Sequence, residues 1–361
     1  MNATSPVNSY NEWDPLEEVI VGRLENAMFP EFDLINQYTF PQEELEFIKA
    51  EWTAGTPYPK DAIIAGQQDL DAFIHILQSE GVIVRQPDIV DYAKSFSTPS
   101  WRSISGFCAA NPRDPFLIIG DEIIETPMAD RSRYFECFAY RSLFKEYFEK
   151  GARWVSAPKP QLTDQLYRSN FKLSQYGDKT IRFVVTEFEP TFDAADFIRC
   201  GRDIFCQKSH VTNAMGIEWL RRYLGEGYRI HEIKSKSPTA MHIDTTLMPL
   251  APGKVLANPQ WTDLDDVRQL FKGWDVLVVP PPVKGNYRSA SIISSWVNMN
   301  VLMLDHSRVI VEKKQTPMID FLKKNGFDPI PCPFENYYDF FGSFHCATLD
   351  IRRKGTCESY F

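Results

Sequence analysis

Two short segments carry a cysteine and a histidine, one in each. These are the residue types that nucleophilic catalysis by a thiol needs. Cys346 follows small and aromatic residues in GSFHCATLDIRR, at the start of a strand-like alternation, where a loop can present its thiol. A thiol nucleophile needs an acid–base partner, and the alternation in AMHIDTTL places His242 and Asp244 on one face of a strand. His345 is the weaker partner, because in a strand it would point away from its neighbour Cys346. The simpler alternatives are a buried structural cysteine and a half-exposed edge strand.

Two further carboxylates stand in turn-like segments just before expected strands. Asp193 lies in TEFEPTFDAAD and Asp114 in NPRD, where a solvated acidic face and a plain turn are the ordinary alternatives. Like Asp244, His242 and Cys346, each lies where a hairpin strand begins, so a ring of such hairpins would bring all five together. Carboxylates match the fixed fork of N–H donors on a guanidinium. The set predicts a guanidinium pocket in which a thiolate faces the central carbon and His242 protonates the departing amine.

The elements that would position these residues follow one pattern five times. Each unit has an amphipathic helical stretch, a glycine that ends it, and a short β-rich run that usually stops near a proline. The helix-ending glycines are Gly81, Gly151, Gly227, Gly273 and Gly326. Two-strand patterns with turn-like centres precede most of these helices, at 116–127, 197–207, 246–259 and 300–314. The remaining arms, 16–24 and 346–355, stand near opposite ends of the chain, and their pairing would close a ring.

This repeat predicts an α/β fold in one closed domain spanning residues 1–361, rather than two or three sequential domains. Segments 26–60 and 161–179, rich in Pro, Asn, Gln and Tyr, are expected to form long loops between the units. Chance alternation in an ordinary α/β protein is the alternative interpretation.

The overall composition narrows the classes of partner. The chain of 361 residues carries 39 basic and 48 acidic residues, a net charge of −9, which repels phosphate backbones and anionic lipid. No stretch approaches the ~20 apolar residues of a membrane-spanning helix, and residues 1–10 lack the features of a signal peptide. Seven cysteines without a Cys-x-x-Cys pair favour reduced thiols. We therefore expect a cytoplasmic protein that binds a cationic or zwitterionic small molecule, not nucleic acid or a membrane.

Several motifs together resemble the amidinotransferase family. They are SYNEWDPLEEVIVGR at 9–23, PRD, EIIETPMADRSRYFE, APKP, FDAADFIRCGRDIF, MHIDTT, NMNVLML and FHCATLDIRRKGTCESYF. The family includes arginine:glycine and inosamine-phosphate amidinotransferases, and the likeness covers nearly the whole chain. It implies a five-bladed ββαβ propeller of the pentein type, with pseudo-fivefold symmetry and a ring closed by the N- and C-terminal strands. It also implies a homodimer without a metal or an organic cofactor.

The resemblance implies a role for each residue of the expected pocket. Cys346 would attack the guanidino carbon of L-arginine, and His242 would protonate L-ornithine as it leaves and then deprotonate a primary amine acceptor. Asp193 would orient His242 and bind the guanidinium, whose other nitrogens Asp114 and Asp244 would hold. The implied intermediate is an amidino-Cys isothiouronium, and the implied kinetics are ping-pong.

Residues expected around the rest of the substrate match the family less closely. Ser294, in SIISSWVNMN, matches a serine that helps to hold the amino-acid end of arginine. Trp261 in NPQW stands where relatives have an arginine for the donor carboxylate, and Thr239 stands where they have an asparagine. The approach to the cysteine, FFGSF at 340–344, is bulkier than the usual run of glycines. This difference predicts an acceptor pocket more apolar than one built for glycine.

The GTCESYF ending resembles amidinotransferases of cyanobacterial toxin pathways, of the saxitoxin and cylindrospermopsin type. We therefore expect a role in secondary-metabolite biosynthesis, with an acceptor larger than glycine. One alternative is an arginine:glycine amidinotransferase that makes guanidinoacetate, and another is an arginine deiminase-like hydrolase of the same fold. Two more distant alternatives are a catalytically idle scaffold and a metal-dependent hydrolase whose ligands would be His242, Asp244, His345 and Cys346.

Overall fold

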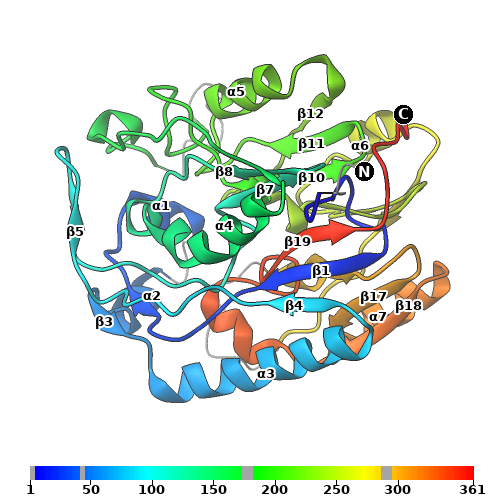
Figure 1. Cartoon of the computed structure of the whole chain (residues 1–361), viewed down its shortest axis with the longest axis horizontal. Helices are drawn as coiled ribbons and strands as arrows, with labels where there is room; N and C mark the ends of the chain where they lie inside the picture. Colours follow the sequence, from blue (N-terminus) through cyan, green and yellow to red (C-terminus); the bar gives the residue numbers. More distant parts are fainter. Residues whose placement is uncertain (1–4, 41–44, 173–181, 286–294) are drawn as a thin grey trace.

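The computed structural model describes residues 5–40, 45–172, 182–285 and 295–361. Its main feature is a set of five three-stranded sheets with one design (Figure 1). In each sheet the middle strand pairs antiparallel on one side and parallel on the other. A helix connects each parallel pair, because parallel neighbours need a crossover connection.

Four of the sheets follow chain order. The first comprises β7 (Phe116–Ile119), β8 (Glu122–Glu125) and β9 (Arg153–Ser156), with helix α4 (Arg141–Glu149). The second comprises β10 (Phe197–Cys200), β11 (Asp203–Gln207) and β12 (Arg229–Ile233), with helix α5 (Ala214–Leu224). The third comprises β13 (Leu247–Ala251), β14 (Lys254–Ala257) and β15 (Asp275–Val278), with helix α6 (Leu264–Leu270). The fourth comprises β16 (Leu302–Met303), β17 (Arg308–Glu312) and β18 (Asp328–Cys332), with helix α7 (Thr316–Lys324).

The fifth sheet joins the two ends of the chain. The C-terminal strand β19 (Thr348–Arg353) pairs antiparallel with β1 (Leu16–Val21). Strand β1 pairs in parallel with β4 (Ile83–Arg85), which follows the long helix α3 (Lys60–Ser79). Figure 1 shows β19, β1 and β4 side by side. The predicted pairing of the two terminal arms is therefore confirmed.

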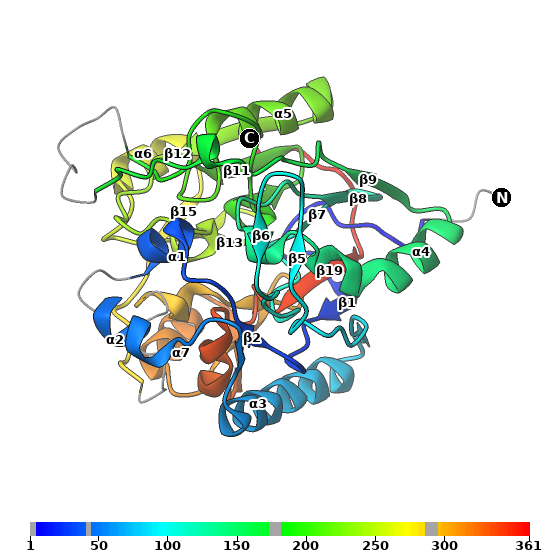
Figure 2. The same cartoon turned by 90° about the vertical axis from the view of Figure 1, so that its left-hand side faces the viewer.

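Burial changes systematically across the sheets. Strands β7, β10 and β13 are buried along their whole length, whereas the third strands β9, β12 and β15 have exposed residues. Figure 2 shows α3, α4 and α5 around the outside, with strands between them. The first strand of each sheet thus lies toward the protein interior, and residues that immediately precede these strands are brought close together.

Buried ion pairs connect the innermost strands. Arg199 of β10 donates to Glu12 at 2.8 and 2.9 Å and to Asp350 of β19 at 3.0 Å. Arg113, in the turn before β7, donates to the same Asp350 at 2.6 Å. Removing one partner from such a buried pair typically costs about 3–5 kcal/mol, because it leaves an uncompensated charge. These pairs therefore fix the positions of the innermost strands relative to one another.

The structure corrects some of the sequence predictions. The expected loop at 26–60 contains two short helices, α1 (Leu34–Thr39) and α2 (Leu45–Glu51), and a small sheet of β2 (Met28–Phe29) and β3 (Thr56–Pro57). Helix α5 ends at Gly225, which has a φ of +63°, and not at the predicted Gly227. Another two-stranded sheet pairs β5 (Phe96–Ser97) with β6 (Arg102–Ser103). Of the expected loop at 161–179, residues 173–179 lie outside the described residues.

All seven cysteines are free thiols, and six of them are buried. Across the described ranges, the helices are too short or too polar to cross a membrane.

Candidate active site

The loops before the innermost strands carry the residues that the sequence singled out. Asp114 lies in the turn before β7, and Asp193 immediately precedes the short 3-10 helix that leads into β10. His242 and Asp244 precede β13, and Cys346 precedes β19. All five side chains are buried. The five residues therefore lie just before the innermost strands, as the sequence predicted. The contacts described below bring them together.

His242 adopts a backbone conformation that few non-glycine residues take. Its φ is +61°, at the start of a 3-10 helix over Ile243–Thr245. The strand predicted for this segment is wrong, and strain of this kind is found mainly at functional sites. The imidazole Nε2 lies 3.0 Å from Asp193 Oδ2, and Nδ1 lies 3.6 Å from Asp114 Oδ1. The sharp turn thus places His242 between two carboxylates.

Cys346 also lies in a turn, and not at the start of a strand as predicted. Its side chain accepts a hydrogen bond from Asn300 Nδ2 at 2.9 Å, and the thiol donates to Asp244 Oδ2 at 3.4 Å. His345 Nδ1 lies 2.9 Å from the same Asp244 oxygen. The prediction that neighbouring His345 points away from Cys346 is therefore wrong, because a turn lacks the alternation of a strand. His345 contacts Asp244, whereas a ring nitrogen of His242 lies within 4.8 Å of the thiol sulfur.

The protonation states follow from burial and from these neighbours. Burial opposes a charge on His242, but Asp114, Asp193 and the cysteine together raise the pKa of the imidazole well above its usual value. Burial, and then the negative charge of Asp244, raise the pKa of Cys346 to about 12, although His242 acts in the opposite direction. Without substrate the site therefore holds a thiol beside an imidazolium, which is ready to act as an acid.

Two carboxylate oxygens in the site make no hydrogen bond within the described residues. Arg133 donates to Asp114 Oδ2 at 2.8 Å and is itself held by Glu136 at 2.6 and 2.7 Å. Asp114 Oδ1 and Asp193 Oδ1 are buried without a hydrogen bond among the residues that the structure describes. Buried acceptors are rarely left unpaired. These oxygens are suited to the N–H donors of a bound guanidinium.

The same centre offers donor atoms for a metal ion. Atoms of Asp114, His242 and Cys346 lie within 4.8 Å of one another. A metal would need a neutral imidazole and a thiolate, whereas the neighbours of His242 favour imidazolium and the surroundings of Cys346 favour the thiol. The donor set therefore suits acid and nucleophile chemistry better, and the absence of a metal requirement stays a prediction.

Comparisons with known proteins identify the family of this chain. No protein-family model matches the chain. SxtG, an amidinotransferase of the saxitoxin pathway from Microseira wollei, is 60% identical, with a TM-score of 0.91 over 99% of this chain and 100% of that chain. An L-arginine:L-lysine amidinotransferase from Pseudomonas savastanoi pv. phaseolicola is 47% identical over 99% of this chain and 97% of that protein. The chain belongs to the amidinotransferase family.

Family membership confirms that this amidinotransferase is a transferase, and it supports the predicted α/β fold of the pentein type. The mitochondrial glycine amidinotransferase of Gallus gallus is also similar, at 45% identity over 99% of this chain and 85% of that protein. An arginine-type substrate and an amine acceptor are implied by the family.

Three further residues were expected around the rest of the substrate, and two of them lie within the described residues. Ser294 lies outside the described residues of the amidinotransferase. Trp261 is partly buried and packs against a core cluster that includes residues of β13 and β14. Thr239 is partly buried in the turn three residues before His242. The roles of these three positions stay predictions.

Sequence reasoning missed Asn300 and Arg133 as site residues. Asn300 donates to both Cys346 Sγ and Asp244 Oδ2, and its Oδ1 accepts from the backbone N–H of His345 at 2.9 Å. It lies just before β16, so the rule that located the other residues would have found it. Arg133 had no such signal, because its role depends on a fold that brings it to Asp114.

Proposed function

We propose that this amidinotransferase moves the amidino group of L-arginine to a primary amine and releases L-ornithine, through a covalent intermediate on Cys346. The observation that supports this most strongly is a buried thiol close to an imidazole that lies between two carboxylates, each with one oxygen that makes no hydrogen bond within the described residues. In this proposal Cys346 is the nucleophile, and His242 is the acid and base. Asp193 orients His242, while Asp114 and Asp244 hold the guanidinium.

In the first half-reaction, the arriving guanidinium neutralises the carboxylates that keep Cys346 protonated, and the thiol loses its proton to solvent. The sulfur bonds to the guanidino carbon. His242 gives its proton to the nitrogen that links this carbon to the arginine chain, and that C–N bond breaks. L-Ornithine leaves, and a cationic amidino group stays on the sulfur beside Asp114 and Asp244.

In the second half-reaction, His242 is neutral and acts as a base. The acceptor amine bonds to the amidino carbon while His242 takes its proton, and the C–S bond breaks. The products are a new guanidine and a Cys346 thiolate, and His242 is again an imidazolium. The Asp193 carboxylate, 3.0 Å from Nε2, stabilises this imidazolium in both directions.

We further propose that the acceptor is larger than glycine and belongs to secondary metabolism of the toxin type, for which the similarity to SxtG is the support. The alternative acceptor is glycine, the substrate named for another relative. Specificity constants for glycine, L-lysine and longer amines decide between them, and a preference for glycine would remove this part of the proposal. The five sheets are proposed to close into one five-bladed ring with pseudo-fivefold symmetry, in a cytoplasmic homodimer of single-domain chains.

Product analysis separates transfer from hydrolysis. We expect L-ornithine from L-arginine, in amounts that rise when an amine acceptor is supplied. Citrulline and ammonia instead would show that water accepts the amidino group, as in an arginine deiminase-like hydrolase. Cys346→Ser, which keeps the size of the side chain, should form neither product.

A further inference from the structure

Asn300 contacts the nucleophile through an amide whose orientation is fixed. The residue is buried just before β16. Its amide oxygen accepts from the backbone N–H groups of His345 and Cys346, at 2.9 and 3.3 Å. A flipped amide would turn its own N–H groups toward these two donors, so the oxygen must occupy this position. The amide nitrogen therefore faces the candidate active site.

The two N–H groups of this amide have one acceptor each. Asn300 Nδ2 donates to Cys346 Sγ at 2.9 Å and to Asp244 Oδ2 at 2.8 Å. A neutral thiol is a weak acceptor, whereas a hydrogen bond to an ionised acceptor is about twice as strong as a neutral one. The contact between Asn300 and the sulfur therefore strengthens as the sulfur gains negative charge.

The surroundings of the sulfur otherwise oppose this negative charge. Burial, and then the charges of Asp244 and Asp114, raise the pKa of Cys346, and the His242 cation acts in the opposite direction. In the proposed mechanism His242 gives up its proton between the two half-reactions, so its support for the thiolate varies. The amide of Asn300 has no proton to give up, and its N–H group faces the sulfur throughout the cycle.

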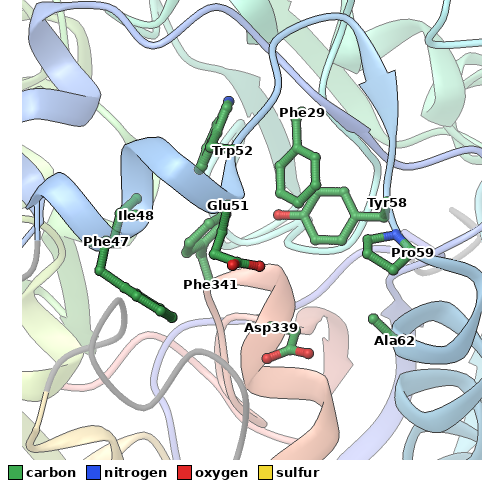
Figure 3. Close-up of a pocket in the computed structure, with 10 residues that line it drawn as sticks. All are labelled: Phe29, Phe47, Ile48, Glu51, Trp52, Tyr58, Pro59, Ala62, Asp339 and Phe341. Carbon is green, nitrogen blue, oxygen red and sulfur yellow. The ribbon is translucent and has the colours of Figure 1, made fainter.

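The turn before Cys346 is also held by packing that does not involve Asn300. Phe341 has a φ of +63°, and its ring stacks on Trp52 with centroids 5.7 Å apart. Figure 3 shows Phe341 and Trp52 among the side chains that line one pocket. At Gly342, the next residue, an added Cβ would lie 2.8 Å from Cys346 Cβ. This packing anchors the turn, so Asn300 is not its only support.

We propose that Asn300 is a catalytic residue, which stabilises the Cys346 sulfur while it carries negative charge. In the first half-reaction the Asn300 N–H donates to the thiolate that attacks the guanidino carbon. In the second, the amine bonds to the amidino carbon while His242 takes its proton, and the C–S bond breaks. The electron pair of that bond goes to the sulfur, where the same N–H stabilises it. This inference rests on the proposed transfer reaction and deepens it by naming the donor to the sulfur.

Alkylation of Cys346 by iodoacetamide tests this contact without any substrate, because only the thiolate reacts. Asn300→Ala removes the donor, and the alkylation rate at pH 8 should fall about tenfold, the usual worth of a hydrogen bond to a charged group. Asn298→Ala is the matched control. Asn298 is equally buried, at 3% exposure, in the 3-10 helix Val297–Met299, but its amide donates to the Pro280 carbonyl at 3.3 Å. Its alkylation rate should equal that of the unaltered enzyme.

A role for Asn300 in holding the turn alone would give the opposite result. Loss of the amide oxygen would then loosen the turn and relieve the burial that raises the pKa of Cys346, so alkylation would be faster. The proposal fails if Asn300→Ala is alkylated as fast as the unaltered enzyme or faster, or if Asn298→Ala is slowed equally.

Asn300→Asp removes the donor but keeps the oxygen that accepts from the backbone. Its second oxygen would replace Nδ2, which lies 2.8 Å from Asp244 Oδ2. Two carboxyl groups so close share one proton, and that proton lies between them and not on the sulfur. Alkylation should therefore again be slower than in the unaltered enzyme, and an equal or faster rate would overturn the proposal even if Asn300→Ala does not fold.

Transfer kinetics test the role of Asn300 in the reaction itself. Loading of the amidino group from L-arginine, and its release by an amine, should each be about tenfold slower or more in Asn300→Ala and unchanged in Asn298→Ala. Slower alkylation with unchanged loading and release would overturn the catalytic role. If no amidino group forms on the unaltered enzyme, the proposed function fails instead, and the alkylation rates still decide whether Asn300 stabilises the thiolate.

Discussion

Replacing Asp244 by asparagine should make Cys346 more reactive while it prevents transfer. Asp244 Oδ2 accepts from the thiol at 3.4 Å, and its negative charge is the largest influence after burial that raises the pKa of Cys346. The asparagine side chain would keep the shape of the aspartate and remove its charge. The thiol should therefore ionise more easily, whereas the guanidinium would lose one of its carboxylates.

The size of this effect follows from the geometry. Two unit charges 3.4 Å apart interact by about 5 kcal/mol at an effective dielectric constant of about 20, an upper bound of about 3–4 pKa units. Side-chain relaxation and entry of water reduce it, so we expect a fall of about 2 units. With a starting pKa of about 12, the thiolate fraction at pH 8 would rise from about 1 in 10,000 to about 1 in 100.

Alkylation by iodoacetamide measures this fraction, because only the thiolate reacts. The rate at Cys346, followed by peptide mass without arginine at pH 8, should be about 100-fold higher in Asp244→Asn. In the unaltered enzyme the rate should rise about tenfold per pH unit through the alkaline range up to the pKa of about 12.

Asp193→Asn is a control in which the rate of Cys346 alkylation should change in the opposite direction. Asp193 helps to raise the pKa of His242, and the His242 cation in turn lowers that of Cys346. Losing the Asp193 charge should therefore make the imidazole neutral at lower pH and slow alkylation. Unchanged or slower alkylation of Asp244→Asn would refute the electrostatic reasoning, as would faster alkylation of Asp193→Asn.

Three further predictions test other parts of the site. Gly342→Ala should destabilise the protein by about 1–3 kcal/mol in chemical denaturation and reduce transfer, because its Cβ would lie 2.3 Å from Asn111 Oδ1; unchanged stability and activity would contradict this close packing. Arg133→Gln should raise the KM for arginine more than it lowers kcat, because Asp114 would lose the partner that holds its Oδ2; an effect on kcat alone would show that Arg133 acts elsewhere. Dialysis against a chelator should leave the transfer rate unchanged, and a loss of rate restored by a divalent metal would place a metal ion in the mechanism.

The hairpins could be predicted because their signals are local. Buried strands such as β7 and β8 are short apolar runs around a Gly-Asp turn, and Gly81, Gly151, Gly273 and Gly326 all have the positive φ expected where a helix ends. The expectation that site residues precede first strands needed only the repeat. It therefore located the five predicted centre residues without knowledge of any distance.

The local shape of the site could not be predicted from the same signals. The segments around His242 and Cys346 alternate like strands, but tertiary contacts hold them as turns: Asn300 Oδ1 accepts from the backbone N–H groups of both His345 and Cys346. Helix α2 was missed because it is one of the short elements whose stability comes from packing, here of Ile48 against Phe40 and Trp52. Contacts between residues far apart in sequence decide the first case, and side-chain packing within the segment decides the second.

The most direct test of the account is the mass of the enzyme after brief exposure to L-arginine alone. Rapid denaturation and peptide mapping should find an added amidino group of about 42 Da on Cys346, which disappears when a competent amine is added. Cys346→Ser should gain no such mass. Transfer to an amine without any adduct on Cys346, or with full activity in Cys346→Ser, would contradict the covalent mechanism.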